Sequence, residues 1–81
     1  MRIKAKVLEL PNEDVAISTD YIKLDSFLKL CGACETGGLA KEVILEGDVC
    51  LNGEVCTQRG RKLRPGDVIT FARKKYTVIS G

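Results

Sequence analysis

The sequence contains no histidine, and only four of its 81 residues are aromatic. Histidine is the side chain that most often performs acid–base catalysis near neutral pH, and its absence also excludes Ser–His and Cys–His nucleophile pairs. The carboxylates are scattered singly among basic residues, so the pattern does not indicate a paired acid and base. We therefore expect a protein that is not an enzyme, with no catalytic residues and no cofactor.

A long hydrophobic run is also lacking. A membrane-spanning helix needs about 18 consecutive apolar residues, and the start of the chain does not have the form of a signal peptide. Eighty-one residues are too few for two ordinary domains. These features predict a cytoplasmic protein without a membrane partner, made of one domain over residues 1–81 and acting as a monomer.

Charge is nearly balanced over the whole chain, with a net of +2, but it is unevenly distributed. Residues 59–75 contain seven basic side chains and one acidic side chain, a net of +6, whereas the rest of the chain carries −4. A fold that gathers these basic side chains on one face would present a positive field to an anionic partner. The alternative is an ordinary solvated surface.

Apolar residues recur at helical spacing in two segments in the middle of the chain. The first predicts a helix at residues 24–31, which Gly32 can end because glycine accepts the left-handed conformation that closes many helices. The second predicts a helix at residues 38–46, capped by Thr36 and ended by Gly47.

Strand and turn signals occupy the two ends of the chain. Period-two alternation and β-rich composition predict strands at residues 3–7, 15–18, 49–51, 68–72 and 76–79, with turns at 11–14, 52–53 and 65–66 and a basic hairpin tip at 73–75. Because strands and helices do not alternate, this order predicts an α+β fold, with two short consecutive helices packed on a small antiparallel β-sheet. The chain then divides into an N-terminal extension (1–14), a core (about 17–71) and a C-terminal hairpin strand (72–81).

Four segments keep a characteristic order and spacing: residues 23–29 (KLDSFLK), 40–41 (AK), 49–55 (VCLNGEV) and 63–69 (LRPGDVI). Together they resemble the S-four RNA-binding domain, the family named after small-subunit ribosomal protein four, over residues 17–71. The resemblance implies a helix pair on a small antiparallel sheet that grips structured RNA, often ribosomal or transfer RNA and possibly on the ribosome. It implies a short, free-standing, bacterial-type member of the family.

The resemblance also implies which residues contact RNA. It places Lys23 at the foot of the first helix, Lys41 in the second, and a basic loop before the Pro-Gly-Asp turn. Ser26 departs from the family pattern, because a basic residue is frequent at its position. The expected RNA-binding residues are Lys23, Lys29, Gly37, Gly38, Lys41, Asn52, Arg59, Arg61, Lys62 and Arg64.

Gly37 and Gly38 stand where the family commonly has an arginine followed by a small hydroxylated residue. Glycines at a helix start leave backbone N–H groups open to a phosphate at the positive end of the helix dipole. The alternative is a flexible turn between two helices. The aromatic residues are too few for a single-strand binder, which favours a reader of the shape and phosphates of folded RNA.

The four cysteines, Cys31, Cys34, Cys50 and Cys56, leave a second function class open. The spacing of the first two suits a metal site, so a small zinc-stapled interaction domain is one alternative. Cys31 also falls on the apolar helix stripe, where cysteine serves as a small hydrophobe, and we expect no metal ligands. A β-grasp sulfur carrier is the other alternative, because those carriers have similar strand and Pro-Gly-Asp segments.

Overall fold

The computed structural model describes residues 10–81. Nine elements follow one another along this part of the chain: β1 (Asn12–Ile17), β2 (Ile22–Lys23), α2 (Leu24–Leu30), α3 (Gly37–Leu45), β3 (Cys50–Leu51), β4 (Glu54–Val55), β5 (Lys62–Leu63), β6 (Val68–Phe71) and β7 (Lys74–Ser80). Within residues 10–81, no helix is long and apolar enough to cross a membrane.

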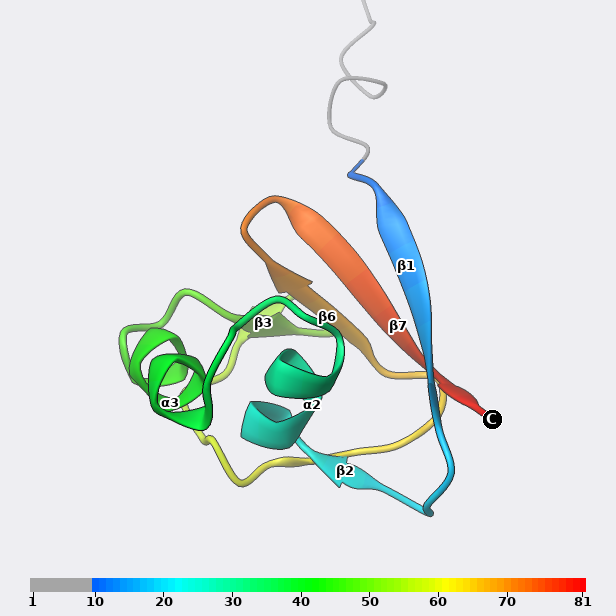
Figure 1. Cartoon of the computed structure of the whole chain (residues 1–81). Helices are drawn as coiled ribbons and strands as arrows, with labels where there is room; N and C mark the ends of the chain where they lie inside the picture. The colour runs from blue at the N-terminus through cyan, green and yellow to red at the C-terminus, as the bar shows by residue number, and fades with distance from the viewer. Residues whose placement is uncertain (1–9) are drawn as a thin grey trace, which may run out of the picture.

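Two sheets organise these elements (Figure 1). The larger sheet has the strand order β1-β7-β6-β3-β4, and its pairs are antiparallel except for β1 and β7, which run parallel. The smaller sheet is the antiparallel pair of β2 and β5. The α+β fold is thus confirmed, with one parallel edge that the order of elements did not predict.

The end of α2 and the start of α3 follow signals that are visible in the sequence. Helix α2 buries Leu24, Phe27 and Leu28, as the apolar spacing predicted, and Gly32 follows it with a φ of 82°. The Thr36 side chain caps α3 by accepting a hydrogen bond of 3.1 Å from the backbone N–H of Leu39.

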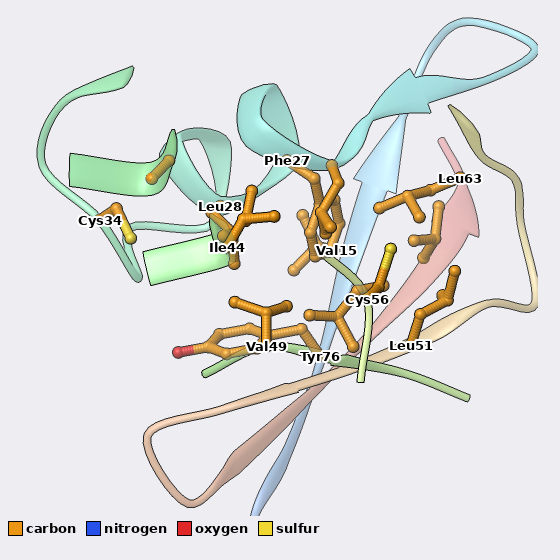
Figure 2. Packing of buried hydrophobic residues seen from close by; sticks show 14 of the residues in the cluster. Val15, Phe27, Leu28, Cys34, Ile44, Val49, Leu51, Cys56, Leu63 and Tyr76 are labelled. Carbon is orange, nitrogen blue, oxygen red and sulfur yellow. The ribbon is translucent and has the colours of Figure 1, made fainter. Parts of the chain in front are cut away.

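One hydrophobic core lies between the helices and the larger sheet (Figure 2). Phe27 and Leu28 of α2 and Ile44 of α3 meet Val49 and Tyr76 from the sheet side. The rings of Phe27 and Tyr76 pack edge to face, with centroids 6.5 Å apart and planes at 83°. The core therefore fixes the position of α2 against the strands that surround it.

For the ends of the chain, two predictions differ from the structure and a third lies outside the described residues. The turn predicted at residues 11–14 is wrong, because Asn12–Ile17 is a strand whose parallel pairing with β7 overrides the local turn signals. The basic hairpin tip is shorter than predicted: the turn consists of Ala72 and Arg73, both at positive φ, and Lys74 already belongs to β7. The strand predicted at residues 3–7 lies outside the described residues.

Candidate nucleic-acid interface

The smaller sheet brings basic residues from distant parts of the chain together. Lys23 of β2 lies opposite Lys62 of β5, and the neighbouring pair joins Ile22 to Leu63. Directly paired strand residues project to the same face, so the two lysines point the same way although 39 positions separate them in sequence. Like charges placed opposite one another disfavour pairing, so this arrangement costs stability unless an anion offsets it.

The start of α2 is held by the loop that follows β4. The backbone N–H of Leu24 donates to the carbonyl of Arg61 over 2.9 Å, and that of Asp25 donates to the carbonyl of Arg59 over 3.1 Å. Lys23, the N-cap residue, makes no side-chain capping bond, so these carbonyls satisfy amides that the helix start would leave open. The arginines serve the fold through their backbone, and their side chains stay exposed.

We call the exposed side chains of Lys23, Arg59, Arg61, Lys62 and Arg64 the α2 basic patch. Lys62 of β5 and Arg64, which follows β5, flank the buried Leu63, and both are exposed. Within residues 10–81 the recorded salt bridge joins Lys74 to Glu13 at 2.8 Å, and no member of the patch takes part in one. The patch is therefore a concentration of positive charge that the described part of the chain does not neutralise.

Asn52 has a structural role that the sequence did not reveal. Its side-chain amide donates to Asp67 over 3.1 Å and accepts from the backbone N–H of Val68 over 2.9 Å. Asp67 in turn accepts from the backbone N–H of Arg64 over 2.9 Å. These bonds tie the Asn52-Gly53 turn to the Pro-Gly-Asp turn and fix the end of the basic loop, while an RNA contact by Asn52 stays a prediction.

The predicted residues on the helices are exposed. Gly37, Gly38 and Lys41 occupy the first half of α3, and Lys29 lies on the outer side of α2. A Cβ atom added at Gly37 would meet nothing within 4 Å, and one added at Gly38 would meet the Thr36 hydroxyl at 3.9 Å. Packing therefore does not require glycine at either position, and both backbone amides stand at an open helix start.

Two of the four cysteines are buried, and the other two, Cys31 and Cys50, are partly exposed. Cys34 and Cys56 are buried, and burial raises the pKa of both Cys31 and Cys34. A raised pKa disfavours the thiolate form of Cys31 and Cys34, which is the nucleophilic form. Within residues 10–81, no three histidine, cysteine or acidic side chains lie close enough together to hold a metal ion.

Tyr21 is the residue near the patch that sequence reasoning did not assign. Its ring lies under the Lys62 ammonium, with the nitrogen 4.8 Å from the ring centroid. In the sequence, the position of Tyr21 two residues before Lys23 was the only indication that it lies near the patch. The contact with Lys62 could be predicted only if the pairing of β2 with β5 were known, because Tyr21 and Lys62 are far apart in sequence.

The helix pair, the mixed sheet and the loop docked on the start of α2 define a small α+β module of the S4 type. The S4 domain family model matches residues 15–79, and the chain belongs to this family. This membership removes the β-grasp alternative.

Two curated proteins are similar to the chain. "Probable ribosome maturation protein RlbA" from Bacillus subtilis (strain 168) is 44% identical over 55 residues, which cover 68% of this chain and 78% of that protein. YbcJ from Escherichia coli (strain K12) is 35% identical over 60 residues, covering 74% of this chain and 86% of YbcJ.

The fold agrees with a solved structure. The solution structure of Escherichia coli YbcJ matches with a TM-score of 0.62 and 29% identity, covering 89% of this chain and 90% of YbcJ. That structure is described as revealing an "alfaL motif involved in RNA-binding". The match covers most of both chains, so the resemblance to the S4 family that four sequence segments indicated is confirmed at the level of the fold.

Proposed function

We propose that this chain is a non-catalytic RNA-binding protein that holds folded RNA through the α2 basic patch. The observation that carries the proposal is the pairing of β2 with β5, which sets Lys23 beside Lys62 while the carbonyls of Arg59 and Arg61 cap α2. Lysine and arginine bind phosphates and release counterions, and arginine adds forked hydrogen bonds. A rigid positive patch suits the phosphates of a folded RNA better than those of a flexible strand.

The relatives support ribosomal RNA over transfer RNA. RlbA is named as a ribosome maturation protein, and the YbcJ structure is described through an RNA-binding motif. Ribosomal RNA carries many closely spaced phosphates in fixed positions, which a patch on a small rigid module can match. The protein would act in the cytoplasm, as a monomer, on ribosomal RNA or on a ribosomal precursor.

Gly37, Gly38, Lys29 and Lys41 would extend the contact from the patch onto the two helices. The Thr36 hydroxyl accepts from the N–H of Leu39, and the two exposed glycines before Leu39 carry no side chain that would block a phosphate oxygen at the start of α3. Their share of the affinity is expected to be smaller than that of the patch, since partial charges on amides are weaker than a full positive charge.

The experiment is a matched pair of charge reversals. Arg61→Glu/Lys62→Glu alters the α2 basic patch, and Arg73→Glu/Lys75→Glu makes the same change of charge at the β6–β7 turn. We expect the first variant to lose about a hundredfold in affinity for purified ribosomal RNA, with a shallower salt dependence, because two phosphate contacts become repulsive. The second is expected to lose less than about threefold.

Both variants leave the hydrogen bonds to α2 in place, because those use the carbonyl of residue 61 and not its side chain. Thermal unfolding of each variant checks this. Equal losses of affinity in the two variants would show that overall charge, and not the patch, governs binding. Unchanged affinity in the first variant would contradict the proposal.

A further inference from the structure

The aromatic rings of the described chain have very different exposures. Phe27 is 0% exposed and Tyr76 is 6% exposed, and Phe71 is partly buried against the core. Tyr21 is 38% exposed and lies on the surface immediately before β2. It is therefore the aromatic side chain of residues 10–81 that is best placed to meet a ligand.

The surroundings of Tyr21 combine a positive charge with an open space. The Lys62 ammonium lies 4.8 Å from the ring centroid, the geometry of a cation–π contact. An open hollow of about 560 Å³ is lined by residues 19–23, so the ring borders space that the protein does not fill. Lys23 belongs both to this hollow and to the α2 basic patch, which places the two features side by side.

The backbone holds Tyr21 firmly for a surface residue. The Thr19 hydroxyl donates a hydrogen bond of 2.8 Å to the carbonyl of Tyr21 and closes the turn before β2. The next residue, Ile22, pairs with Leu63, whose side chain is fully buried. The backbone that carries the ring is therefore fixed before a ligand binds, so stacking on Tyr21 does not have to order the chain.

We propose that Tyr21 is a stacking platform for one unpaired base of the RNA and that Lys62 binds a phosphate next to that base. The inference rests on the proposed function and names the RNA feature that it requires: a bulged or looped-out nucleotide beside a helical stem. Every base has a π-face, so the platform accepts any of the four bases. Lys62 exchanges its contact with the ring for a phosphate oxygen, and the base takes a place on the tyrosine.

The test uses two RNA hairpins that share one stem, of which only the first has a bulged adenosine. Wild-type protein is expected to bind the bulged hairpin more tightly than the paired one. Tyr21→Ala should lower affinity for the bulged hairpin about tenfold and leave affinity for the paired hairpin unchanged, because a stacked base is lost and no phosphate contact is. Tyr21→Phe, which keeps the ring, should bind both hairpins as the wild type does.

Leu45→Ala serves as the control for loss of an exposed apolar side chain, since Leu45 is 57% exposed at the end of α3. In a Tyr76→Phe background, fluorescence reports Tyr21 alone, and the bulged hairpin should quench it more strongly than the paired one. Equal affinities of Tyr21→Ala and wild type for the bulged hairpin overturn the inference, as does an equal loss for both hairpins.

The failure of this inference is distinguishable from failure of the proposed function. If Arg61→Glu/Lys62→Glu abolishes binding to both hairpins while Tyr21→Ala changes nothing, RNA binding stands and the stacking role is wrong. If the double charge reversal leaves binding to both hairpins intact, the patch is not the RNA site, and the stacking role is overturned with it.

Discussion

The two basic groups of the chain, the α2 basic patch and the three residues Arg73, Lys74 and Lys75 that we call the hairpin group, lie at opposite ends of the molecule (Figure 1). Apart from Lys23, both groups belong to the basic stretch of residues 59–75. The patch recruits Lys23 from a distant strand, and its loop is bonded to α2 through main-chain carbonyls. In the hairpin group, Lys74 donates to Glu13 over 2.8 Å and lies 5.1 Å from the ring centroid of Tyr76.

This difference shows that a basic run becomes a binding site through its neighbours. At the α2 basic patch, the fold gathers like charges and leaves them without acidic partners among the described residues. In the hairpin group, the fold gives one of three charges a carboxylate partner and sets the turn residues Ala72 and Arg73 at positive φ. The α2 basic patch therefore keeps its charges available to bind phosphate, whereas in the hairpin group Lys74 forms an ion pair that stabilises the fold.

The largest effect should come from a charge reversal in the α2 basic patch, compared with a matched charge reversal in the hairpin group. We expect Lys23→Glu to lower affinity for ribosomal RNA more than tenfold, because it removes one phosphate contact and places a carboxylate beside Lys62. Arg73→Glu should change affinity less than about twofold. Filter binding at two salt concentrations measures both. A larger loss for Arg73→Glu than for Lys23→Glu would reverse the comparison.

The second prediction concerns the bonds that fix the end of the basic loop. Asn52→Gly keeps the positive φ of this position and removes its side-chain bonds to Asp67 and Val68. We expect a loss of about 2 kcal/mol in the free energy of unfolding, measured by urea denaturation. RNA affinity should fall a few-fold through loosening of the loop near Arg64. The matched change Gly53→Ala tests the backbone alone, since Gly53 has a φ of 90°.

The third prediction asks whether the patch extends to α3. Gly37→Ala/Gly38→Ala adds two methyl groups into open space and favours the helix, so thermal stability should not fall. Affinity for ribosomal RNA should fall about threefold, because the methyl groups obstruct a phosphate at the helix start. Unchanged affinity with raised stability would show that the two glycines do not contact the RNA.

The smallest effect should come from removing the carboxylate that pairs with Lys74. The hydrogen bond that Lys74 donates to the Glu13 carboxylate raises the pKa of Lys74 above its ordinary value of 10.5. The stability that this pairing contributes is therefore fully present below pH 10.5 and lost as pH rises through the raised pKa. Glu13→Gln should lower stability slightly at neutral pH, and this difference should vanish in alkaline solution. RNA affinity should be unchanged, and a clear gain would show that the hairpin group can also bind RNA.

Local signals in the sequence predicted the two helices and the turns at residues 52–53 and 65–66, because each depends on neighbouring residues. Apolar spacing identified the buried side of α2, and Thr36 and Gly32 marked where helices begin and end. The parallel pairing of β1 with β7 was not predictable in this way. It depends on contacts between residues such as Val15 and Val78, which no local pattern links.

The basic residues of the candidate site could be predicted from the sequence, but the contacts that hold them in place could not. The basic residues were visible as a run, and the family resemblance added Lys23. The roles of Asn52 and Tyr21 were not visible, because each depends on a partner that is far away in the sequence: Asp67 for the first and Lys62 for the second. Side chains that serve the fold and side chains left free for a ligand look alike until these partners are known.

Ultraviolet cross-linking of the protein to ribosomal RNA, followed by mapping of the modified peptides, shows which surface contacts the RNA. We expect cross-links in two segments, residues 20–24 and 59–64, which are separate in sequence and joined by the pairing of β2 with β5. Cross-links confined to residues 72–76, or spread evenly over the surface, would contradict it.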